Sequence, residues 1–230
     1  MNFDFDKIKN DALNILTNVE YITAFLCGSN STGLSHNMSD VDVIVLSDSK
    51  NIHINSSSIM EMQVVSMTDI EISINDMLKS RFLNCNSQFL IANLYHGIAL
   101  INYKEFHDLR EDIPWKVIIN NMVIDRIRGY KFYKKDAYKF YNTLDYNSSR
   151  FCLQKSLESL IDAYMFTKKQ LIVKEKWRIK WLKLHNIQLF NELISLYTSI
   201  WSRKDMSIVT SMFESYCIKI NLLIQEGKHE

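Results

Sequence analysis

The chain has 230 residues, of which 47% are hydrophobic and 23% are charged, a composition ordinary for a globular protein with a buried core. Its length fits one large domain or two small ones. The formal net charge of +1 gives no global reason to expect a long nucleic acid or an anionic membrane as partner, whereas a small anion responds to local charge.

The termini and the cysteines predict a soluble, cytoplasmic protein. The N-terminal residues MNFDFDKIKND contain no basic segment followed by an apolar one, so no secretory signal is expected. No apolar run approaches the roughly 20 residues needed to span a bilayer. Four cysteines lie far apart without zinc-binding spacing, which indicates reduced thiols: Cys27, Cys85, Cys152 and Cys217.

The first half of the chain alternates between short strands and helices. A helix is expected at 5–19, where apolar residues recur at helical spacing. Buried strands are expected at 21–27 and 41–46, where β-branched and aromatic residues dominate. A third strand at 58–67 alternates, which puts Glu61 on the face opposite its methionines.

Two helices and a fourth strand follow the alternating strand. Thr68, with Glu71 three residues later, predicts the cap of a helix over about 69–81. A second helix is expected at 87–96, ending at Gly97, followed by a strand at IALIN and a short helix at KEFHDLRED.

The second half changes character after the only proline, Pro114. Long helical patterns begin at Trp115 and predict four or five helices, with breaks near 146–149, 173–176 and 202–205. We therefore expect an α/β (α+β) domain with a small mixed sheet at 1–113. An all-α helical bundle is expected at 114–230.

The stretch FLCGSNSTGLSHNMSDVDVIVL carries the strongest functional signal. Asp40 and Asp42 share one face at the start of a strand because side chains alternate with period two. Two such close carboxylates repel unless a cation lies between them, and oxygen ligands suit Mg²⁺. Upstream, Gly28 and Ser29 end a strand, and backbone N–H groups of such a turn suit a phosphate.

Gly28-Ser29, Gly33 and Ser39-Asp40-Val41-Asp42 together resemble the signature of the polymerase-β-type nucleotidyltransferase superfamily. Its minimal nucleotidyltransferases and aminoglycoside adenylyltransferases pair this domain with a C-terminal helical bundle. The resemblance covers about the first 105 residues. It implies a two-metal transfer in which Asp40 and Asp42 bind Mg²⁺ while Gly28, Ser29 and Gly33 form the loop that holds the phosphates of ATP or another NTP.

The same resemblance gives Glu61 the role of third metal ligand or of base for the acceptor hydroxyl. The segment KEKWRIKWLKL resembles only an aromatic and basic segment of the helical half. There Lys176, Arg178 and Lys180 either reach the triphosphate across an interdomain cleft or lie along a packed aromatic seam. Glu158 is a weaker candidate for a carboxylate from the helical half.

The leading hypothesis is a Mg²⁺-dependent adenylyltransferase that moves an NMP to a hydroxyl-type small-molecule acceptor and releases pyrophosphate. An alternative is nucleotide addition to tRNA or protein in a toxin–antitoxin or defence system. It is favoured by the basic and aromatic side chains that alternate in RIRGYKFYKKDAYKFY. On a long helix the same pattern also fits a solvent-exposed face. Arg178 and His185 have a spacing that some ribonuclease toxins use, although chance also gives such pairs. A catalytically idle nucleotide-binding module is the third alternative. Acceptor, nucleotide base and oligomeric state stay open.

Overall fold

The computed structural model describes residues 4–35, 39–48, 60–79, 83–172 and 174–227. The chain divides into two compact units, Met1–Trp115 and Lys116–Glu230. The first unit is an α/β unit and the second is entirely helical in its described part, so the expected fold class is confirmed.

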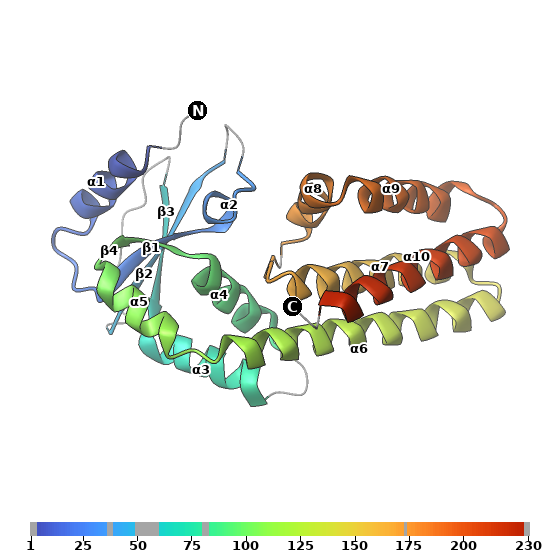
Figure 1. Ribbon diagram of the computed structural model, residues 1–230, viewed down its shortest axis with the longest axis horizontal. Coiled ribbons are helices and arrows are strands. Elements are labelled where there is room, and N and C mark those ends of the chain that lie inside the picture. Colours follow the sequence, from blue (N-terminus) through green and yellow to red (C-terminus); the bar gives the residue numbers. More distant parts are fainter. Residues whose placement is uncertain (1–3, 36–38, 49–59, 80–82, 173, 228–230) are drawn as a thin grey trace. The chain divides into compact units, whose positions relative to one another are not determined.

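A four-stranded mixed sheet organises the first unit (Figure 1). Its strand order is β3-β2-β1-β4, with β1 antiparallel to both β2 and β4 and with β3 parallel to β2. In chain order the elements of this unit are α1 (Phe5–Ile15), β1 (Thr23–Cys27), α2 (Gly28–Ser31), β2 (Val41–Ser47), β3 (Met60–Ser66), α3 (Met67–Lys79), α4 (Cys85–His96), β4 (Ile98–Ile101) and α5 (Tyr103–Glu111).

Two groups of helices cover the two faces of the sheet (Figure 1). One face packs against α1, whose Ala12 joins a core with Val43, Val45 and Met62; Leu16, the C-cap of α1, belongs to the same core. The other face carries the side chains that alternate with these along each strand, and it is covered by α3, α4 and α5. Phe25, for example, contacts Phe106 of α5 with ring centroids 4.8 Å apart. Asp42 and Glu61 belong to this second face, since side chains alternate along each strand.

Two details of the first unit differ from expectation. The helix α1 ends at Ile15, four residues before the expected end. The cap of α3 is not Thr68 with Glu71: the Ser66 N–H donates to Asp69 Oδ2 (3.2 Å) and the Asp69 N–H donates to Ser66 Oγ (3.1 Å), so the capping box lies two residues earlier. The expected strand start at Ser58 and helix end at Arg81 lie outside the described residues.

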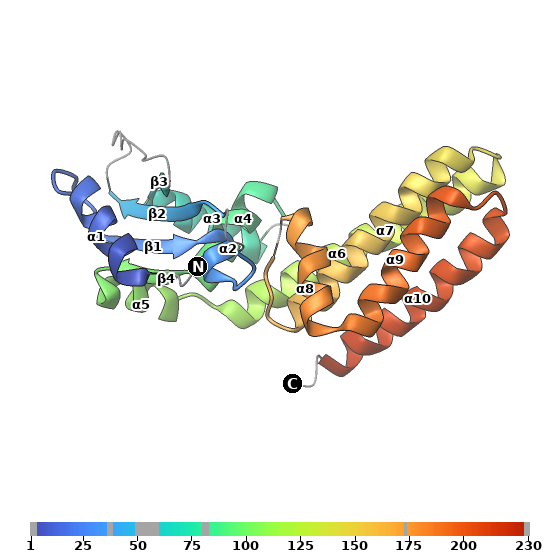
Figure 2. The same cartoon turned by 90° about the horizontal axis from the view of Figure 1, so that it is seen from above.

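The helical unit contains α6 (Trp115–Asn142), α7 (Tyr146–Thr167), α8 (Glu175–His185), α9 (Ile187–Ser202) and α10 (Met206–Gly227). In Figures 1 and 2 α6, α7, α9 and α10 run lengthwise alongside one another, and contacts pair α7 with α10 and α9, and α9 with α10. Gly129 of α6 lies against α7, where a Cβ would be 3.2 Å from Ser159 Oγ.

Two helix boundaries differ from the expected breaks. The first break lies before Tyr146, because Asp145 caps α7 by accepting from the Ser148 N–H at 3.1 Å. A break at Asn186 was not expected: its side chain accepts from the Leu189 N–H at 3.0 Å and starts α9.

The C-terminal helix α10 corrects the expectation that no segment is long and apolar enough to span a membrane. Within the described residues it is the one helix that meets this test by length and composition, with a mean hydropathy of 1.2. The core helix of a bundle passes the same test, and α10 buries Val209, Phe213, Ile220 and Ile224 in the helical unit. We therefore assign α10 to the bundle.

Candidate active site

Gly28 and Asp42 fit against each other at the junction of β1, α2 and β2. Gly28 has φ +67°, a conformation that costs other residues free energy. A Cβ on Gly28 would lie 2.9 Å from Cγ of Asp42 and closer still to its Oδ2. The side chain of Asp42 therefore lies in the space that the missing side chain of Gly28 leaves open.

Asn30 ties the glycine turn to the other aspartate. Its Nδ2 donates a hydrogen bond of 2.7 Å to the backbone oxygen of Asp40, ten residues away. The turn itself is held by Ser31 Oγ and Thr32 Oγ1, which both donate to the Gly28 carbonyl at 3.1 Å. Asn30 was not among the expected site residues, although its place beside Gly-Ser was a signal for a side chain that fixes the turn.

Asp42 and Glu61 lie side by side on neighbouring strands. The parallel register pairs Asp42 of β2 with Glu61 of β3, and residues paired in this way project from the same face about 4.8 Å apart. On its other side Asp42 pairs with Cys27 of β1. The condition for Glu61 to serve as third carboxylate, that its strand is a neighbour of the Asp42 strand, is met.

The remaining residues of the expected phosphate loop lie in and after α2. Ser29 is buried within α2, and its carbonyl accepts from the Leu34 N–H at 3.0 Å. Gly33 has φ +70°, and a Cβ there would meet no described atom within 4 Å. Gly33 is therefore required by backbone conformation, whereas Gly28 is required by conformation and by Asp42.

The carboxylates of Asp40, Asp42 and Glu61 suit a hard divalent cation by chemistry, because all three offer oxygen ligands. Asp40 is exposed and Asp42 half-buried, so a cation could reach both. In the described residues the three do not gather into a group of ligand atoms within 4.8 Å. His107, Asp108 and Glu111 do, but they lie exposed on one helix, where such acidic groups are common without a metal.

The three basic residues expected at the triphosphate lie on α8 in different environments. Lys176 is exposed and Lys180 half-buried, and the Nζ atoms of both lie over the Trp177 ring, 5.0 and 5.3 Å from its centroid. Arg178 is buried, and it donates from Nε (2.7 Å) and Nη2 (3.0 Å) to the carboxylate of Asp162.

Arg178 therefore has a structural partner within the helical unit. Burial acts to lower its pKa, but the carboxylates of Asp162 and Glu158 outweigh burial and raise it. A phosphate contact by Arg178 would require this pair to open, so we do not carry Arg178 forward as a phosphate ligand. Glu158 is buried too and accepts from Gln154 at 3.0 Å and Lys155 at 2.8 Å.

His185 does not form a site with Arg178. Its ring stacks on Trp181 with centroids 4.7 Å apart, and its Nδ1 lies 3.0 Å from the Trp181 carbonyl oxygen. The ribonuclease-like spacing of the two residues, which chance also gives, therefore has no support in the contacts of either side chain.

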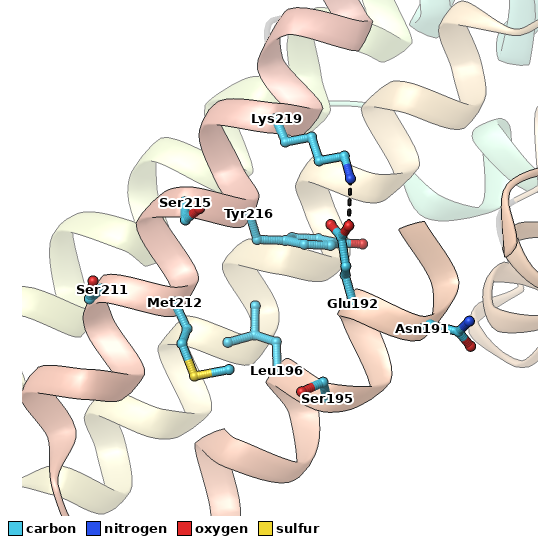
Figure 3. Close-up of a pocket in the computed structure, with 9 residues that line it drawn as sticks. All are labelled: Asn191, Glu192, Ser195, Leu196, Ser211, Met212, Ser215, Tyr216 and Lys219. Carbon is cyan, nitrogen blue, oxygen red and sulfur yellow. Dashed lines mark hydrogen bonds and ion pairs between the residues drawn. The ribbon is translucent and has the colours of Figure 1, made fainter. Parts of the chain in front are cut away.

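A wide groove of about 760 Å³ lies between α9 and α10 in the helical unit (Figure 3). Its walls carry Ser195, Ser211 and Ser215, and an ion pair of 2.6 Å between Glu192 and Lys219 crosses it. Because these two charges neutralise each other, the groove presents hydroxyl groups rather than a net charge.

Comparison with known proteins finds similarity among solved structures. No protein-family model and no curated protein matches the sequence. Among solved structures, a nucleotidyltransferase-like protein from Exiguobacterium sibiricum 255-15 matches over 95% of this chain and 75% of its own, with a TM-score of 0.52 and 11% identity. At that identity the likeness concerns the fold. The chain has a nucleotidyltransferase-like fold: an α/β unit followed by a helical region.

Proposed function

We propose that the protein is a Mg²⁺-dependent nucleotidyltransferase, with ATP as the expected donor, that transfers an NMP to a hydroxyl-type acceptor. The observation that carries this proposal is the junction where Gly28 makes room for Asp42, which in turn pairs with Glu61. The glycine turn lies against Asp42 there, Asp42 and Glu61 are partners on adjacent strands, and the fold of the structural relative is consistent with this use.

The chain's own residues have distinct roles in this proposal. Gly28, Ser29 and Gly33 shape the loop that receives the phosphates, and Asn30 holds that loop against Asp40. Asp40 and Asp42 hold the cation, and Glu61 either completes its ligands or accepts the proton of the acceptor hydroxyl. A bound Mg²⁺ supplies charge neutralisation on the phosphate oxygens. The acceptor oxygen then bonds to the α-phosphorus as the bond to pyrophosphate breaks.

The phosphates of a bound NTP would also need basic side chains to balance their negative charge. In the described part of the first unit the basic side chains are Lys7, Lys9, Lys79, Lys104 and Arg110. Arg110 donates to the carbonyls of Tyr95 (2.7 Å) and Gly97 (3.2 Å), where it stabilises the end of α4. Lys176 and Lys180 of α8 remain phosphate contacts predicted from the sequence alone.

Pyrophosphate release from labelled ATP with a panel of hydroxyl-bearing small molecules tests the proposal. We expect release with at least one acceptor, and its loss in the Asp40→Ala, Asp42→Ala double variant. Unchanged turnover in that variant would exclude the proposed site. Tight Mg²⁺–ATP binding without release for any acceptor would favour the idle nucleotide-binding module instead.

A second candidate, nucleotide addition to RNA, is favoured by one observation on α6. Phe132 is 61% exposed, and Lys131 and Lys135 beside it are exposed as well. Exposed aromatics among lysines suit the stacking of unpaired bases. Binding of single-stranded RNA at low salt that weakens in Phe132→Ala would support this candidate, and absence of RNA binding at low salt would remove it.

A further inference from the structure

A second recess lies inside the first unit, on the sheet face that carries Asp42 and Glu61. It measures about 450 Å³ and lies between β2 and β3 on one side and α3 and α4 on the other. Ile44 and Gln63 line its floor, and Phe89, Leu90, Ser73 and Asn93 belong to its walls.

The floor of this recess lies along the same two strands as the candidate active site. Ile44 is two residues after Asp42 on β2, and Gln63 is two residues after Glu61 on β3, so all four side chains share one face. Two residues of a strand span about 6.6 Å. A ligand with phosphates at Gly28 and Ser29 therefore has the recess within reach of its other end.

Two polar side chains that line the recess are without a hydrogen-bond partner among the residues that the structure describes. Asn93 is 8% exposed and Ser73 is 6% exposed, and neither side chain makes a hydrogen bond within the described residues. An amide offers both donors and an acceptor to a ligand that enters the recess. By contrast, Ser87 nearby donates to Asp76 at 2.9 Å. Asn93 and Ser73 are therefore free to bind a ligand that enters the recess.

The charge of the recess decides the class of ligand. No lysine or arginine is among its described lining residues, and its one carboxylate, Asp69, is engaged by Ser66 in the cap of α3. An anion gains nothing there. A flat, neutral ring with apolar faces and a hydrogen-bonding edge fits both the apolar side chains and the amides of Asn93 and Gln63.

We propose that this recess binds the nucleobase of the NTP. The inference rests on the proposed function, since it assigns the other end of the same donor nucleotide. Asn93 and Gln63 then select the base by hydrogen bonds to its edge, and Phe89, Leu90 and Ile44 contact its apolar surface. The recess makes the first unit responsible for the choice of nucleotide.

Calorimetric titration with Mg²⁺ and hydrolysis-resistant analogues of the four NTPs, compared with inorganic triphosphate, tests the inference. We expect at least one NTP analogue to bind more tightly than triphosphate. In Asn93→Leu and in Gln63→Leu its affinity falls about fivefold, while triphosphate affinity is unchanged. Asn75→Leu, on the exposed face of α3, is the matched control and should change neither affinity.

The outcomes separate this inference from the proposed function. If all four analogues and triphosphate bind equally, or if Asn93→Leu and Asn75→Leu have equal affinities for the analogue, the recess does not bind the nucleobase. The proposed nucleotide transfer is then unaffected. Absence of any Mg²⁺–NTP binding overturns both. If Asn93→Leu does not fold, Gln63→Leu at the exposed edge decides. The free nucleoside should compete with the analogue; binding of both together would assign the recess to an acceptor and overturn the inference.

Discussion

Asp42 fills the space beside Gly28 that any side chain on that glycine would take, with its Cγ 2.9 Å from the position of the absent Cβ. This relationship joins two motifs that lie fourteen residues apart in the chain. The turn that follows β1 and the carboxylate near the start of β2 are therefore packed against each other, and a side chain added at Gly28 would displace that of Asp42.

Gly28→Ala tests the contact between the glycine turn and Asp42. The added methyl group must displace Asp42, and the backbone must hold φ +67° with a Cβ, which costs about 1–2 kcal/mol of the free energy of unfolding. We expect nucleotide transfer to be lost with a modest drop in stability, measured by pyrophosphate release and urea unfolding. Gly33→Ala is the control. It has a similar φ but open space, so its stability should fall comparably while Asp42 stays in place. Equal activities of the two variants would contradict this.

Glu61→Gln tests the third carboxylate. The amide keeps the size of the side chain but loses the charge that a metal ligand or a base needs, so turnover should fall at least about a hundredfold. Glu71→Gln, exposed on α3, should retain full activity. Steady-state rates of pyrophosphate release at several Mg²⁺ concentrations check both variants. If Glu61 is a metal ligand, higher Mg²⁺ should partly restore the variant, and if it is the base it should not.

Arg178→Met tests the buried ion pair of the helical unit. Removing the guanidinium leaves Asp162 buried without its main partner, which costs about 3–5 kcal/mol in other proteins. Arg178→Met with Asp162→Leu should recover part of that loss, because Glu158 keeps Lys155 at 2.8 Å whereas Arg126 loses Asp162, which lies 3.5 Å from its Nε. Urea unfolding of the two single variants and the double variant gives the coupling free energy between the two side chains. A loss below about 1 kcal/mol in Arg178→Met would show that the pair contributes little.

His96 predicts a pH dependence of stability. Burial, and secondly the charge of Arg110, lower its pKa to about 4, against about 6.5 in the unfolded chain. Between these values the unfolded chain binds a proton that the folded chain does not. The free energy of unfolding should therefore fall as pH drops from 6.5 towards 4, by up to about 3 kcal/mol.

The control for this prediction is His96→Gln, which removes the titrating group and should flatten the profile over that range. His107→Gln, at an exposed position, should follow the unmodified protein. Identical profiles for His96→Gln and the unmodified protein would show that His96 does not set the slope.

The first unit was predictable from sequence because its signals are local. Alternation along β3 put Glu61 opposite Met60 and Met62, and the structure has that pattern of burial. The register that pairs Glu61 with Asp42 was not predictable, since nothing in the sequence of one strand fixes its neighbour. Ser66 and Thr68 are both good caps, so the sequence does not decide between them, and the structure uses Ser66.

The helical unit was predictable as a bundle but not in its buried polar contacts. Arg178 lies in a basic segment, which indicated a contact with phosphate. Its partner in the structure is Asp162, sixteen residues earlier on α7. Helix packing decides which face of α8 turns inward, and periodicity does not distinguish a buried arginine from an exposed one. The side chains of Asn93 and Ser73 gave no sequence signal either, because their lack of partners follows from how α3 and α4 pack.

A crystal structure of the protein with Mg²⁺ and a hydrolysis-resistant NTP analogue tests the central claim most directly. We predict a cation bound by Asp40 and Asp42, phosphates against the Gly28–Ser29 turn, and Glu61 in contact with the cation or facing the α-phosphate. A nucleotide bound elsewhere in the first unit, or one that leaves Asp42 without contact to the cation, would contradict the account.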